Sequence, residues 1–155
     1  MNTLISSYIS QIKDLMGAET WLDETFQKKL KGINDKNAFV RPTEDLHSVA
    51  EIISHLVVWR ASLLSIFKTG KRTVRMDSPE NWKTNEELKK EGWKELLKKL
   101  QSTQKEVVSF FSEKDDQWLK KKKPGGKDIF EYYVIGWIQH DVYHLGQIGI
   151  VRKYL

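Results

Sequence analysis

Apolar residues recur at intervals of three and four along most of the 155-residue chain, and no segment alternates at intervals of two. The first spacing is typical of helices with one buried face, whereas the second would indicate strands. Turn-rich segments at residues 34–45, 69–84 and 113–127 leave helical stretches at about 3–33, 49–68, 85–112 and 129–155. We therefore predict an all-α fold, an antiparallel four-helix bundle whose first helix is broken near Gly17, in a single domain over residues 1–155.

The starts of three predicted helices carry capping signals. Ser48 and Glu51 stand three residues apart, and in a capping box each of these side chains satisfies a backbone N–H at the helix end. Thr84 and Glu87 repeat the arrangement one helix later. Asp128 is the predicted N-cap of the last helix, which follows a Pro-Gly-Gly turn.

The composition narrows the class of protein. The chain contains 39% hydrophobic residues and no cysteine, so it can build a core but has no disulfide, thiolate metal site or cysteine nucleophile. The N-terminal segment lacks the basic and apolar regions of a signal peptide, and no uninterrupted apolar run approaches the ~18 residues of a membrane span. We expect a cytoplasmic protein without a membrane partner.

The net charge of +5 raises the question of nucleic acid binding. However, the lysines are interleaved with glutamates along residues 89–106, which is typical of a solvated helix face. The remaining lysine cluster, at residues 120–123, is a short basic turn that specifies no nucleic acid sequence. We therefore do not expect nucleic acid as a partner.

The histidines are the candidate functional residues. His140 and His144 are four residues apart, so both imidazoles lie on one helix face, and His55 lies on the inward face of another predicted helix. Burying an unpaired polar group costs about 1–3 kcal/mol, and one metal ion would satisfy all three rings. A histidine on an apolar face is also commonly a hydrogen-bonded core residue, so spacing alone leaves both interpretations open.

Neighbouring polar residues are candidates to orient these rings. Gln147 lies three residues after His144 and Glu51 one turn before His55, so either side chain can accept the free imidazole N–H or lie over the metal. The fourth histidine, His47, precedes the capping serine on a different side of the helix, and we do not expect it to be a ligand.

Other polar residues have simpler interpretations. Asp141 points away from its neighbour His140 and is expected to contact an adjacent helix or to form a capping contact. Tyr143 is expected to pack between helices, with a place in the lining of a pocket as the alternative. Arg60 and Arg152 are near the polar edges of their helices, and we interpret both first as surface ion-pair residues, with carboxylate binding as the alternative.

Two segments resemble the signatures of the DinB-like superfamily. They are QHDVYHLGQI at residues 139–148 and HSVAEIISHL at residues 47–56, the latter followed by Trp59. The resemblance implies a four-helix bundle, often dimeric, in which one histidine of the second helix and the pair in the last helix bind a divalent metal. By motif position these are His55, His140 and His144.

Three imidazoles leave at least one coordination position free, which is typical of catalytic rather than structural sites. The ligand set suits zinc, nickel or ferrous iron. Because the resembling family includes bacillithiol- and mycothiol-dependent S-transferases, our first hypothesis is transfer of a low-molecular-weight thiol to a small-molecule substrate. The alternatives are a metal-dependent hydrolase in which Glu51 accepts a proton, and a non-enzymatic metal- or ligand-binding module of stress response.

The last helix is apolar on a second side as well. This face is formed by Ile135, Val142, Gly146, Gly149 and Ile150. Small residues permit close helix approach, so the face either packs on another helix of the chain or forms a symmetric contact. Because the resembling family is often dimeric, we expect a homodimer.

Overall fold

The computed structural model describes residues 3–155, and within that range the chain is all-helical and forms no strand, which confirms the predicted all-α class. The helices are α1 (Thr3–Gly17), α2 (Phe26–Leu30), α3 (Val49–Thr69), α4 (Asn85–Glu91), α5 (Trp93–Ser112), α6 (Asp116–Leu119) and α7 (Phe130–Val151), with short 3-10 helices at Pro79–Asn81 and Arg152–Tyr154.

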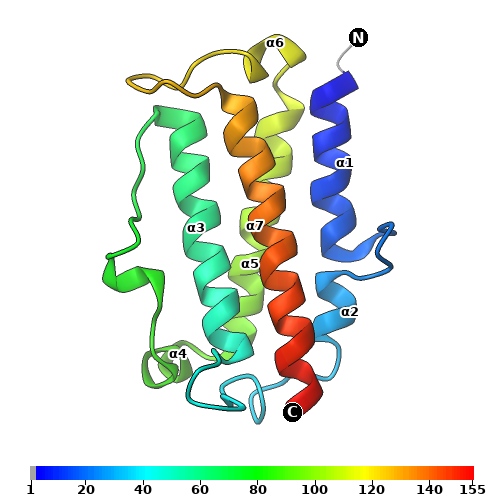
Figure 1. Cartoon of the computed structure of the whole chain (residues 1–155), viewed down its shortest axis with the longest axis vertical. Coiled ribbons are helices and arrows are strands. Elements are labelled where there is room, and N and C mark those ends of the chain that lie inside the picture. The colour runs from blue at the N-terminus through cyan, green and yellow to red at the C-terminus, as the bar shows by residue number, and fades with distance from the viewer. Residues whose placement is uncertain (1–2) are drawn as a thin grey trace.

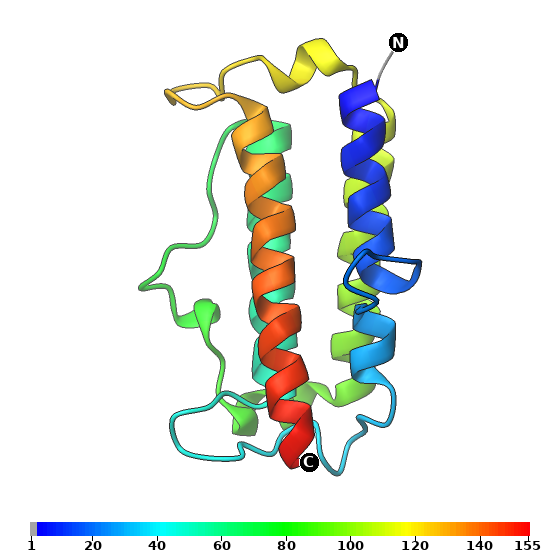
Figure 2. The same cartoon turned by 45° about the vertical axis from the view of Figure 1, so that its right-hand side comes forward.

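The four long helices lie side by side (Figure 1). Helices α3 and α7 form one layer, and α1 and α5 form the other (Figure 2). In Figure 1, α1 and α7 run in one direction while α3 and α5 run in the other. Helix α3 is therefore antiparallel to its neighbour α7 but parallel to α5, because the segment 70–84 returns along the outside of α3 before the chain enters α4 and α5.

Some helix ends agree with the sequence prediction and others differ from it. The capping boxes at Ser48 and Thr84 form as predicted. The predicted helix over residues 85–112 is divided into α4 and α5 by Gly92, whose φ of 89° lies outside the helical region and favours glycine. Asp128 is not the N-cap of α7, because the helix starts one residue later, after Ile129, without a side-chain cap.

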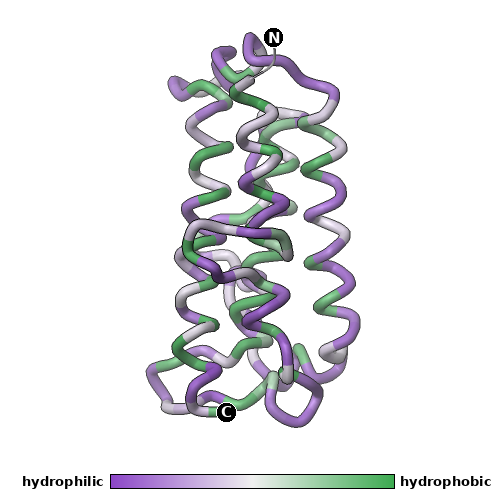
Figure 3. Tube along the Cα trace, turned by 90° about the vertical axis from the view of Figure 1, so that its right-hand side faces the viewer, coloured by the Kyte–Doolittle hydropathy of each residue, from purple (hydrophilic) through white to green (hydrophobic). Residues whose placement is uncertain are grey.

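Each long helix carries both hydrophobic and hydrophilic positions, as Figure 3 shows. By length and composition, α3 is the one helix within residues 3–155 that could cross a membrane. However, 67% of its most apolar window is buried inside the bundle. Its composition is therefore accounted for by its place in the core, between α5 and α7.

An ion pair crosses this core. Arg60 of α3 and Asp141 of α7 are each 1% exposed, and Arg60 Nη2 lies 2.6 Å from Asp141 Oδ2. The guanidinium also lies over the rings of Phe26 and Trp137. The interpretation of Arg60 as a surface residue is therefore wrong, whereas the expected contact of Asp141 with another helix is confirmed.

Candidate metal centre

Three histidine side chains meet between α3 and α7, the antiparallel neighbours. His55 comes from α3, and His140 and His144 come from α7. The Nε2 atom of His140 lies 3.1 Å from Nε2 of His55 and 3.1 Å from Nε2 of His144. All three candidate ligand atoms lie within 4.8 Å of one another, so the structure brings together the three residues that the sequence analysis selected.

The outer ring nitrogens define which atoms face the centre. His55 Nδ1 lies 3.0 Å from the backbone carbonyl of Asn81, and His144 Nδ1 lies 2.6 Å from Oε1 of Gln147. Both partners are acceptors, so each Nδ1 carries the proton and each Nε2 presents a lone pair toward His140. His140 has one Nε2 proton at most, so it cannot satisfy both lone pairs.

A divalent cation fits this arrangement, because it would accept all three lone pairs. Zinc–imidazole bonds of about 2.0–2.1 Å in a tetrahedral site separate neighbouring nitrogens by about 3.3 Å, close to the separations seen here. Three buried histidines near one another are compatible with metal binding. Two of them are held by hydrogen bonds that fix the ring orientation, as is usual for metal-ligating histidines.

Asn81 is the functional residue that the sequence analysis missed. Besides accepting from His55, it accepts a 2.7 Å hydrogen bond from Trp59 Nε1 at its side-chain oxygen. Its amide nitrogen donates to the carbonyl of Met76. Asn81 is buried although it lies in the long segment between α3 and α4, so its hydrogen bond to His55 holds this segment against the histidine cluster. The sequence shows only that Asn81 lies in a turn-rich segment, and this position does not predict a contact with His55.

Gln147 takes the orienting role predicted for it. Its Oε1 contacts His144, and its Nε2 donates a 3.1 Å hydrogen bond to the hydroxyl of Tyr143. Tyr143 is 63% exposed, so it lies at the edge of the centre rather than packed between helices as expected.

The Glu51 carboxylate is bound by residues other than the three histidines. Its carboxylate accepts hydrogen bonds from Nε and Nη2 of Arg41, at 2.8 and 2.5 Å, and from the backbone N–H of Ser48. Burial raises the pKa of Glu51, but the Arg41 and Ser48 hydrogen bonds outweigh it and hold the pKa below its usual value. The ring nitrogen of His55 that Glu51 was expected to orient contacts Asn81 instead.

His47 is separated from the three histidines by the indole of Trp82. The Trp82 ring stacks on His47 at 3.7 Å between centroids and on His55 at 4.0 Å. His47 is therefore not one of the grouped ligands, in agreement with the sequence analysis. The stacked indole covers one face of the His55 ring and shields the centre from that side.

Burial also sets the protonation of the imidazoles. It lowers the pKa of His55 to about 4, against a smaller upward effect of the Asn81 carbonyl. It lowers the pKa of His140 to about 3, assisted by the neighbouring His144 and His55, and it lowers the pKa of His144 as well. All three rings are therefore neutral at neutral pH, which is the form that binds metals.

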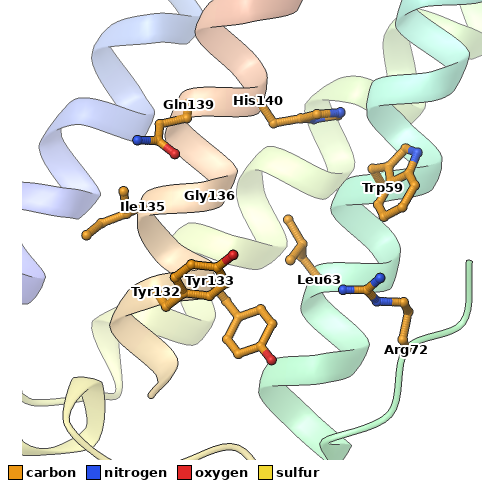
Figure 4. Close-up of a pocket in the computed structure, with 9 residues that line it drawn as sticks. All are labelled: Trp59, Leu63, Arg72, Tyr132, Tyr133, Ile135, Gly136, Gln139 and His140. Atoms are coloured by element: carbon orange, nitrogen blue, oxygen red, sulfur yellow. The ribbon is translucent and has the colours of Figure 1, made fainter. Parts of the chain in front are cut away.

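A pocket of about 380 Å³ lies next to the centre (Figure 4). His140 forms one end of it, and Trp59, Leu63 and Tyr133 supply much of its apolar lining. Figure 4 shows the His140 ring reaching from α7 toward Trp59 on α3. Small-molecule sites are typically concave, largely apolar and of this size or larger.

The fold and the site together define a helical protein with a candidate metal centre between two of its long helices. A sequence model of the DinB superfamily matches residues 20–148, most of the chain and all three histidines, so the protein belongs to the DinB superfamily. No curated protein matches the chain.

Proposed function

We propose that the protein is a divalent-metal-dependent S-transferase that joins a low-molecular-weight thiol to a small electrophilic molecule. The observation that carries the proposal is the position of His140, which belongs both to the histidine cluster and to the wall of the adjacent pocket. A group bound in the pocket would therefore lie beside the metal centre. Membership of the DinB superfamily supports the choice of reaction.

The metal, which we propose to be zinc, nickel or ferrous iron, would act as a Lewis acid that lowers the pKa of the thiol. Residues of the chain orient the metal ligands and limit the access of water. Asn81 and Gln147 hold His55 and His144 with their Nε2 atoms directed inward, and Trp82 excludes water from one side. Because the protein has no cysteine, the nucleophilic sulfur must come from a co-substrate.

The test is a conjugation assay with full-length protein loaded with zinc or nickel. Cysteine or bacillithiol serves as the thiol, and 1-chloro-2,4-dinitrobenzene serves as the electrophile. In the reaction a carbon–sulfur bond forms, chloride leaves, and the thiol proton passes to the buffer. We expect acceleration over the uncatalysed rate that is lost in His140→Ala and retained in Gln117→Ala, an exposed position on α6. Equal rates with and without the loaded protein would refute the proposal.

Two other functions are less well supported. Hydrolysis with Glu51 as proton acceptor requires a free carboxylate, and the Glu51 oxygens already accept hydrogen bonds from Arg41 and Ser48. A Glu51→Gln variant that keeps its metal but loses ester hydrolysis would favour this alternative. A purely metal-binding role leaves the pocket beside His140 without a purpose, whereas a ligand-binding role without catalysis would use it.

We also propose that the chain forms a homodimer through α7. Ile135, Val142 and Ile150 of this helix are 38%, 37% and 55% exposed, so the second apolar face is not covered by the rest of the chain. At the edge of this face, Gly149 lies against the side chain of Lys29. Sedimentation at micromolar concentration tests the proposal: Val142→Glu should convert a dimer to a monomer, and a wild-type monomer would contradict it.

A further inference from the structure

We infer that the pocket beside His140 receives a small apolar molecule that carries a carboxylate, and that Arg72 binds this carboxylate. The inference deepens the proposed S-transferase function, on which it rests, by naming the chemical class of the electrophilic substrate and a residue that selects it. Three observations support it: the lining of the pocket, the position of Arg72, and the contacts that already occupy the other arginines considered for this role.

The pocket is apolar on most sides and cationic at one edge. It is lined by Trp59 and Leu63 of α3 and by Tyr132, Tyr133 and Ile135 of α7. Figure 4 shows Arg72 extending from the segment after α3, with its guanidinium directed toward Leu63. The Arg72 Cζ atom lies 5.9 Å from the ring centroid of Trp59, so the cation is positioned against the wall of the pocket.

The guanidinium of Arg72 is available to a ligand. Among residues 3–155, no carboxylate lies within 4.0 Å of it, and none of the hydrogen bonds formed in that range uses its side chain. A guanidinium presents a planar fork of N–H donors that matches a carboxylate. Arg72 is exposed, so a carboxylate can reach it from solvent while the apolar part of the molecule enters the pocket.

The arginines that the sequence analysis considered for this role are occupied. Arg60 is buried against Asp141, and Arg152 donates to the backbone carbonyl of Lys28. Neither lines the pocket, whereas Arg72 does.

Tyr133 adds a neutral polar group beside Arg72. Burial raises the pKa of its hydroxyl, the charge of Asp128 adds to the effect, and Arg72 opposes it. The hydroxyl therefore stays protonated and can donate a hydrogen bond to an anionic ligand. Asp128 is the acidic group of this region, and it forms no ion pair with Arg72 within 4.0 Å. The combination of a free guanidinium, a phenol donor and apolar walls suits an apolar carboxylate.

The test compares two probes of the same shape, phenylacetate and its neutral amide, phenylacetamide. Their affinities are measured by NMR titration of the full-length protein, both zinc-loaded and after removal of metal with EDTA. We expect phenylacetate to bind about tenfold more tightly than phenylacetamide in both forms, because the preference comes from Arg72 and not from a carboxylate–zinc bond. Arg72→Gln should abolish the preference and leave the affinity for phenylacetamide unchanged.

Two further variants complete the experiment. Arg75→Gln is the matched control, since Arg75 is exposed in the same segment but does not line the pocket. It should behave as the wild type does. Gly136→Leu should weaken both probes at least tenfold by filling the pocket, and a Cβ at Gly136 meets nothing within 4 Å, so the helix accepts it.

Equal affinity of wild type for the two probes would overturn the inference, as would a preference that persists in Arg72→Gln or exists only with zinc. Binding that survives Gly136→Leu would place the probes outside the pocket and would also overturn it. None of these measurements uses catalysis. The binding results can therefore fail while the conjugation assay succeeds, or the reverse, and the two failures are distinguishable.

Discussion

Arg60 and Asp141 form a buried ion pair that joins α3 to α7 near the three clustered histidines: Arg60 Nη2 lies 2.6 Å from Asp141 Oδ2, and Asp141 directly follows His140. Burial raises the pKa of the Asp141 carboxyl, and the Arg60 guanidinium acts in the opposite direction. Because the pair fixes how α7 is rotated against α3, it keeps His140 directed toward His55.

Asp141→Ala should be strongly destabilising. The substitution leaves the Arg60 charge buried without its partner, and breaking a buried pair in this way costs about 3–5 kcal/mol. Urea unfolding should show that loss, whereas Asp77→Ala, at an exposed position without a hydrogen-bond role among residues 3–155, should stay within about 0.5 kcal/mol of wild type. A loss below 1 kcal/mol for Asp141→Ala would contradict the structural role of the pair.

Gln147→Leu should weaken zinc binding about 10- to 100-fold, because it removes the acceptor that holds the Nδ1–H of His144. Competition with a chromogenic chelator measures the change. Gln117→Leu is the control, since Gln117 is exposed and far along the chain from the histidines. If zinc affinity is the same in both variants, Gln147 does not orient His144.

The metal-free protein should lose stability as the pH falls from 6.5 toward 4. The unfolded chain binds a proton at each histidine near pH 6.5, whereas burial lowers the folded pKa of His55 to about 4 and of His140 to about 3. In this interval the unfolded state binds more protons, so each histidine removes about 1.4 kcal/mol per pH unit. Stability is complete above pH 6.5 and is lost as the pH falls through the folded pKa values.

Urea unfolding at a series of pH values checks this dependence. His140→Phe keeps an aromatic ring but cannot titrate, so its stability should fall less steeply between pH 6.5 and 4 than that of wild type. Parallel slopes for the two proteins would mean that His140 is protonated equally in the folded and unfolded chain.

The three histidines could be predicted from the sequence because helical periodicity places them on inward faces and the resemblance to the DinB-like signatures selects them as ligands. A spacing of four puts His140 and His144 on one face of α7, and the apolar residues around His55 direct it inward. The role of Gln147 could be predicted for the same reason, since this residue lies one turn beyond His144.

The residues that escaped prediction depend on contacts between distant segments. Asn81 reaches His55 from the short 3-10 helix at Pro79–Asn81, and Arg72 reaches the pocket from an irregular part of the same connecting segment, where no helical periodicity applies. Arg60 looked like a surface residue because nothing local reveals its partner, which is 81 positions away in the sequence. Glu51 could be placed in its capping box, but its pairing with Arg41 required the fold of the preceding loop.

The central claim is that His55, His140 and His144 bind one divalent ion. Elemental analysis and calorimetric titration of metal-free protein with zinc test it most directly, with His140→Ala as the variant and His47→Ala as the control. We expect one tightly bound ion per chain in wild type and in His47→Ala, and a loss of at least about 100-fold in affinity in His140→Ala. Unchanged zinc content in His140→Ala, or no binding by wild type, would contradict the claim.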